Sequence, residues 1–180
     1  MPKLIKHDRV LDDRWTLLGA DAALGDVPAT GPVLVPLRLW QTERGALLAR
    51  GEIGVWLAPD EDPSKLAGDI AQLPVIAVAF PKFGDGRGFS TARLMRDRYG
   101  FAGELRAIGD IFRDQLFFLR ECGFDAFAVR SDLDAEKELA GMTVFDRVYT
   151  ASTHTPHPWF RERVARVAEA APGDVRFPCG

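Results

Sequence analysis

A glycine-rich loop with two cations is the segment of this sequence best suited to chemistry. Residues 81–90 read Pro-Lys-Phe-Gly-Asp-Gly-Arg-Gly-Phe-Ser and follow an apolar run. Glycines let the backbone approach a ligand closely, and helix-start amides together with the Arg87 guanidinium suit an oxyanion. The spacing fits neither a dinucleotide fingerprint nor a P-loop, so the sequence identifies no cofactor. The alternative is a tight turn in which Asp85 pairs with Arg87.

A second group of polar candidates lies between residues 104 and 116. Arg106 falls within an apolar run, where a charge needs a partner, so a structural pair with Asp110 or Asp114 and a ligand contact are both open. Asp110 is expected to cap the next helix, and Asp114 is the candidate general acid or base. The residues expected to bind a ligand are Asp85, Arg87, Arg106, Asp110, Arg113 and Gln115.

Cysteine and histidine do not form a recognisable metal or redox site. Cys122 and Cys179 are too few for an iron–sulfur cluster, and Cys122 is expected in the core. Cys179 stands next to the last residue, where a sulfur-carrying arm or an inert thiol is possible. His154 and His157 are interrupted by prolines, which favours a coincidental pair over a metal site. We therefore predict no metal.

Short apolar runs alternate with helical segments, and this alternation must position the candidate residues. The expected strands are 33–37, 55–58, 75–80, 105–108 and 126–129, with a sixth at 144–149, and the expected helices are 39–50, 63–72, 89–99, 111–122 and 134–139. Strands without polar alternation that are joined through helices predict an α/β fold with a predominantly parallel sheet. Five to six strands built from βα units form an open sheet or a partial barrel, because a closed barrel needs eight units. Ligands bind at the carboxyl edge of such a sheet.

Composition limits the classes of protein to consider. The chain has 180 residues with 47% hydrophobic and 27% charged content, which predicts a single α/β domain over residues 1–150. Residues 151–180 are expected to form a loop and a helix, 159–171, packed on this domain or on a partner. A net charge of -3 argues against nucleic acid. No apolar run is long enough for a membrane span or a signal peptide, which predicts a cytoplasmic protein, with homo-oligomerisation left open.

Three sequence blocks resemble a known bacterial family. They are Gly-Asp-Gly-Arg-Gly-Phe-Ser at 84–90, Gly-Glu-Leu-Arg-Ala-Ile-Gly-Asp-Ile-Phe-Arg-Asp-Gln-Leu at 103–116, and Gly-Phe-Asp-Ala-Phe at 123–127. They are similar to a bacterial family of unknown function whose members are labelled oxidoreductases involved in sulfite reduction, because they are encoded beside sulfite reductase. The similarity covers roughly residues 83–129 and is weaker upstream, at 55–60.

The resemblance implies a role in sulfur assimilation. We expect an accessory protein or small enzyme of assimilatory sulfite reduction that binds an oxyanion, or a sulfated or phosphorylated ligand, at the carboxyl edge. Sulfite reductase or its electron donor is the implied partner. One alternative is a non-catalytic assembly or interaction factor for sulfite reductase. The other is a partial-barrel enzyme acting on a small phosphorylated metabolite.

Overall fold

The computed structural model describes residues 2–130, 132–143, 149 and 151–155. Its strands are β1 (Lys3–Lys6), β2 (Arg9–Asp12), β3 (Thr16–Leu17), β4 (Val33–Pro36), β5 (Ile53–Leu57), β6 (Val75–Phe80), β7 (Glu104–Gly109) and β8 (Ala126–Val129). The α-helices are α1 (Leu37–Arg50), α2 (Arg87–Arg93), α3 (Arg113–Glu121) and α4 (Ala135–Leu139). Shorter turns are η1 (Leu24–Asp26), η2 (Pro63–Leu66), η3 (Ile70–Gln72), the π-helical η4 (Leu94–Arg98) and η5 (Ala140–Thr143). Within the described residues, no helix combines the length and apolar character needed to cross a bilayer.

All eight strands form one sheet in the order β2-β1-β8-β7-β6-β5-β4-β3. Strands β3 to β8 pair in parallel, and β1 runs antiparallel to both β2 and β8. The predicted α/β fold with a mainly parallel sheet is therefore confirmed. The predicted strand count was wrong, because β1, β2 and β3 are only four, four and two residues long. The expected strand at 144–149 and the expected helix at 159–171 fall on segments outside the described residues, apart from residue 149.

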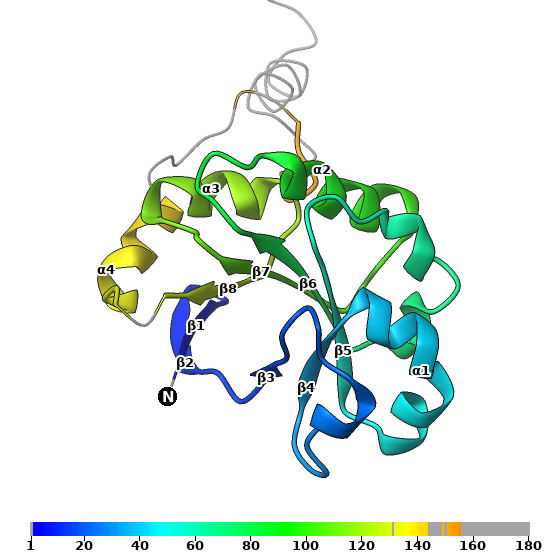
Figure 1. Ribbon diagram of the computed structural model, residues 1–180. Helices are drawn as coiled ribbons and strands as arrows, with labels where there is room; N and C mark the ends of the chain where they lie inside the picture. The colour runs from blue at the N-terminus through cyan, green and yellow to red at the C-terminus, as the bar shows by residue number, and fades with distance from the viewer. Residues whose placement is uncertain (1, 131, 144–148, 150, 156–180) are drawn as a thin grey trace, which may run out of the picture.

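The sheet is strongly curled. Strands β2 and β3 occupy opposite edges of the sheet, yet only residues 13–15 separate them in the chain. That connection spans at most about 14 Å, whereas eight flat strands are about 34 Å across. The edges must therefore approach each other, and the sheet closes into the half-barrel seen in Figure 1.

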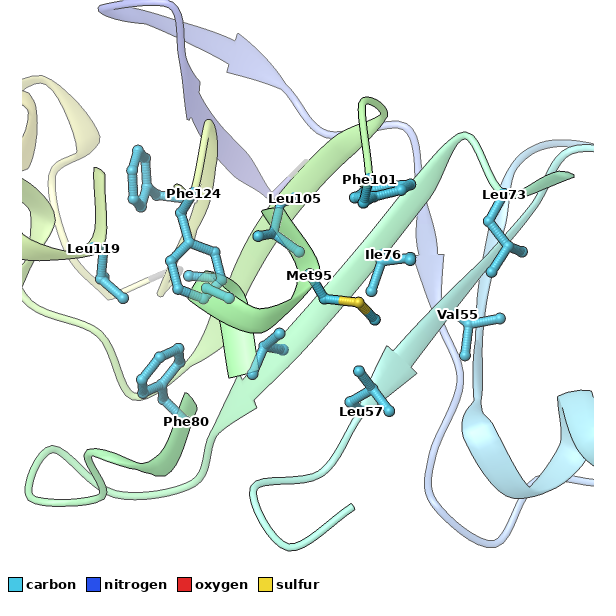
Figure 2. Close-up of a cluster of buried hydrophobic side chains, with 14 of the residues drawn as sticks. Val55, Leu57, Leu73, Ile76, Phe80, Met95, Phe101, Leu105, Leu119 and Phe124 are labelled. Carbon is cyan, nitrogen blue, oxygen red and sulfur yellow. The ribbon is translucent and has the colours of Figure 1, made fainter. Parts of the chain in front are cut away.

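The two faces of the half-barrel have different coverings. The four α-helices lie along its convex side (Figure 1). Ile76 and Phe80 of β6 face these helices and belong to the main core, where Figure 2 shows them near Met95 and Phe124. Alternate residues face the concave side, where a smaller buried cluster contains Leu34, Val75, Ala77 and Ile108. Apolar residues on both faces explain why these strands lack polar alternation.

Candidate functional site

The concave face is hollowed at the carboxyl ends of β5, β6 and β7. This hollow, the carboxyl-edge pocket, has a volume of about 150 Å³ and is lined by Leu17, Trp56, Ala79, Phe80, Pro81, Ile108 and Gly109. Parallel α/β sheets bind their ligands at this edge. The pocket is therefore the candidate functional site.

Backbone geometry and one hydrogen bond shape the pocket. Gly109 has a φ of 103°, and a Cβ atom there would lie 2.4 Å from the carbonyl oxygen of Phe80. Only glycine thus lets the end of β7 approach β6 so closely. The indole Nε1 of Trp56 donates to the carbonyl of Leu18 at 3.0 Å, which fixes the ring against the N-terminal segment. Because this bond satisfies the indole N–H, the pocket wall stays apolar.

The glycine-rich loop after β6 forms one side of the rim. Arg87 donates from Nε and Nη2 to the two carboxylate oxygens of Asp85, at 2.9 and 2.7 Å. The hydrogen bond from Arg87 holds the pKa of the Asp85 carboxyl below its ordinary value. A Cβ at Gly88 would lie 2.5 Å from the Phe80 ring, so this glycine lets α2 pack onto β6. The structure has the Asp85–Arg87 pair that the tight-turn alternative predicts.

A second arginine, Arg130, pairs with two aspartates beyond the carboxyl ends of β7 and β8. Arg130 donates from Nη1 to Asp110 at 2.6 Å and from Nη2 to Asp132 at 2.8 Å. Its guanidinium also lies 5.6 Å from the centre of the Phe112 ring. Both carboxylates hold the pKa of Arg130 above its ordinary value. Sequence reasoning placed Arg130 in the loop after the fifth apolar run but did not include it among the ligand-binding residues.

Arg106 has different partners from those expected. Its side chain is 1% exposed, and Nη1 donates to both carboxylate oxygens of Asp13 at 2.8 Å while Nε donates to Glu104 at 2.7 Å. The expected pairs with Asp110 or Asp114 were wrong, because Arg106 lies in the amino half of β7 and both aspartates follow its carboxyl end. The structure therefore does not bring Arg106 to the pocket rim.

The ion pairs of Arg106 extend into a network on the concave face. Lys6 of β1 donates to Glu104 at 2.6 Å, and the Arg106 guanidinium lies 5.8 Å from the centre of the Trp15 ring. Burial by itself raises the pKa of Glu104, but the hydrogen bond from Lys6 and the charge of Arg106 outweigh burial and keep this pKa below its ordinary value. The network of Lys6, Glu104, Arg106 and Asp13 ties the N-terminal strands to the centre of the sheet.

The start of α3 holds the remaining predicted residues. Residue Phe112, not Asp110, precedes the first turn, so the predicted cap was wrong. The Gln115 side chain accepts from the Phe112 amide at 3.2 Å and donates to the Phe83 carbonyl at 3.0 Å, which anchors the glycine-rich loop. The Arg113 amide donates to Glu138 at 2.6 Å. The side chain of Asp114 is exposed.

Two polar hollows lie away from this edge, near the end of α3 and the start of β8. Their volumes are about 160 and 240 Å³, and both are lined by Arg120, Phe124, Asp125 and His154. Burial raises the pKa of Asp125 despite the nearby Arg96. No group of three metal-binding side chains occurs in the described part of the chain. His157 and Cys179 fall outside that part, and burial raises the pKa of the half-buried Cys122 thiol.

Together these features define a parallel α/β half-barrel with an apolar pocket at its carboxyl edge and a buried ion network behind it. The chain belongs to a bacterial family described as "Bacterial protein of unknown function (DUF934)", whose model matches residues 54–160. This confirms the resemblance to a bacterial family of unknown function. The matched region holds all but the first residue of β5, all of β6 to β8 and most of the pocket lining, but not the N-terminal strands. No curated protein matches the chain.

Proposed function

We propose that this protein is an accessory protein or small enzyme of assimilatory sulfite reduction that binds an anionic ligand at the carboxyl edge of its half-barrel. The observation that carries the proposal is the carboxyl-edge pocket, with Lys82 in the loop that leaves it and Arg87 at the start of α2. The resemblance to proteins encoded beside sulfite reductase supplies the pathway. Sulfite reductase or its electron donor is the proposed partner.

At the rim of the pocket, Arg87 holds the Asp85 carboxylate and can also bind an oxyanion from solution. Arg87 uses Nε and Nη2 to hold Asp85, which leaves Nη1 to meet an incoming oxyanion. A guanidinium binds sulfite, sulfate or phosphate through parallel N–H donors. The Asp85 carboxylate holds the Arg87 guanidinium when no ligand is bound, and a doubly charged oxyanion would compete with it for these donors.

Titration calorimetry with sulfite, sulfate and phosphate tests the binding step. Arg87→Ala should weaken sulfite binding about tenfold, the loss of one charge-assisted contact. Arg93→Ala is the matched control, because Arg93 is as exposed as Arg87 and also pairs with an aspartate, Asp97. Equal sulfite affinity in the wild type and Arg87→Ala would remove Arg87 from the site, and phosphate binding without sulfite binding would favour a phosphorylated metabolite.

Growth of a deletion strain tests the pathway. Cells lacking the gene should grow poorly on sulfate or sulfite and normally on cysteine, because cysteine bypasses the reductive branch. The wild-type gene should restore growth, and Arg87→Ala should restore it only in part. Normal growth of the deletion strain on sulfite would show that the sulfur assignment is wrong.

A second candidate is an interaction factor that docks on sulfite reductase. Exposed apolar side chains favour it, since Leu17 and Phe83 are 52% and 53% exposed and lie at the same edge as the pocket. In this case Phe83→Ser should abolish co-purification with sulfite reductase and leave sulfite affinity unchanged. Loss of sulfite affinity with co-purification intact would favour the ligand-binding function instead.

A further inference from the structure

The carboxyl-edge pocket has an apolar lining that suits a ring rather than an oxyanion. We propose that it receives a single six-membered aromatic ring of a small ligand, and that the anionic group of this ligand stays outside, at the rim. This inference rests on the proposed function for the location of the anion and adds the chemical class of the ligand. An enclosed apolar cavity of about 150 Å³ binds benzene, and the present pocket, which is open to solvent on one side, has a similar volume.

Three polar groups of the pocket wall already have partners. The Trp56 indole donates to Leu18, the Asp110 amide donates to the Phe80 carbonyl at 2.6 Å, and the Ile111 amide donates to the Gly109 carbonyl at 3.1 Å. A charged group inside the pocket would lose its water and gain no hydrogen bond in return. The part of the ligand that enters must therefore be apolar.

The shape of the wall favours a flat group. Ala79 and Gly109 contribute little or no side chain, whereas the half-buried indole of Trp56 presents a rigid aromatic surface. Aromatic pairs gain from offset or edge-to-face contact beyond the burial of their area. A flat ring between the Trp56 side and the Ile108 side fits these dimensions better than a branched alkyl group.

Besides Arg87 of the proposed function, Lys82 lies beside the pocket and can meet the anionic group of the ligand without giving up an ion pair with a described residue. Arg87 and Arg130 each hold carboxylates, whereas Lys82 has no ion pair with any residue that the structure describes. Lys82 is exposed and directly follows Pro81, which lines the pocket. A ring carrying a carboxylate or sulfonate can therefore place its ring in the pocket and its charge near Lys82.

Benzoate and acetate test the ring directly, because they share a carboxylate and differ in the ring. Benzoate should shift the methyl NMR signals of Leu17, Ala79 and Ile108, and acetate should bind about tenfold more weakly or not at all. Ala79→Leu fills the pocket and should weaken benzoate binding about tenfold. Ala128→Leu is the matched control, since Ala128 is half-buried on the same concave face but does not line the pocket.

Two further variants keep the test independent of folding. Leu17→Ala removes an exposed residue of the pocket wall and should weaken benzoate binding. Lys82→Ala should also weaken benzoate binding, but saturating benzoate should shift the same methyl NMR signals as in the wild type. Equal benzoate affinity in the wild type, Ala79→Leu and Leu17→Ala would overturn the ring proposal, and so would equal binding of acetate. Sulfite binding that depends on Arg87 would then still stand. Benzoate binding at these methyl groups together with normal growth on sulfite would instead reject the sulfur role and leave the ring site.

Discussion

Arg106 is the central charged residue of the ion network on the concave face. Its guanidinium is almost completely buried and is neutralised by Asp13 and Glu104, whose side chains are 9% and 10% exposed. Such a group is structural, because none of its charge is left over for a ligand. Removing it would leave two nearly buried carboxylates without a partner.

Arg106→Ala should therefore lower the free energy of unfolding by about 3–5 kcal/mol. Arg93→Ala, which breaks an exposed pair, should change it by less than about 0.5 kcal/mol. Urea denaturation followed by circular dichroism measures both. Similar stabilities for the two variants would show that the buried network contributes no more than a surface ion pair.

The same network predicts how stability depends on pH. Because the folded-state pKa of Glu104 lies below its unfolded value, the unfolded state binds the proton more tightly, and the stabilisation is present above the unfolded pKa. It should be lost as the pH falls from about 4.3 through the folded pKa. Urea denaturation at several pH values should show that the free energy of unfolding falls less steeply at acid pH in Glu104→Gln than in the wild type. Identical slopes in the two proteins would contradict this assignment.

At the scale of elements, the close approach of β6 and β7 sets the pocket. Gly109→Ala adds a Cβ at 2.4 Å from the Phe80 carbonyl in a left-handed conformation, so the end of β7 must move. We expect a loss of about 2 kcal/mol or more in unfolding free energy and loss of benzoate binding. Gly45→Ala in α1 is the control, because its Cβ meets no atom within 4 Å, and it should stabilise by about 0.5–1 kcal/mol. Equal changes in unfolding free energy for Gly109→Ala and Gly45→Ala would mean that the end of β7 can move without cost.

Sequence reasoning found the elements whose own residues determine them. Strands β4, β5, β6 and β8 are apolar runs, and β7 is apolar apart from Glu104 and Arg106, so all five were predicted; their parallel pairing follows from the helices and turns between them. The expected helix at 63–72 is instead two separate turns, η2 and η3, because Gly68 and a bond from Asp69 to Leu66 interrupt it. The strands β1 to β3 gave no pattern, since they are only two to four residues long and β1 depends on pairing with the distant β8.

The candidate site was predictable only in part, for a similar reason. The loops at the carboxyl edge follow from the strand order, so Asp85, Arg87 and Asp110 were found at this edge. The partner of Arg106 is Asp13, which is 93 positions away in the sequence, and no local signal connects the two. Leu17 of the pocket also comes from the N-terminal segment, which only the curl of the sheet brings close.

At the scale of the whole molecule, the half-barrel should be most stable at its centre. Strands β6 and β7 are paired on both sides and buried on both faces, whereas β2 and β3 form the edges. Amide hydrogen exchange should therefore be slowest in β6 and β7 and fastest in β2 and β3. Asp13→Ala should speed exchange in β1 and β2 and leave β5 unchanged, and uniform acceleration would show that the N-terminal strands do not open separately.

Because β1 pairs with β8, it cannot reach its final place in the sheet until the ribosome has synthesised β8. Lys3 to Lys6 are translated before the chain reaches their partners, Ala126 to Val129. At about 5–20 residues per second, the first hairpin waits roughly 6–24 s for the strand on which it docks. A two-stranded hairpin is at best marginally stable alone, so during this interval β1 and β2 are exposed to proteases and chaperones. Strands β1 and β2 are therefore made long before the strand on which they dock, and this docking has to wait until β8 has been synthesised.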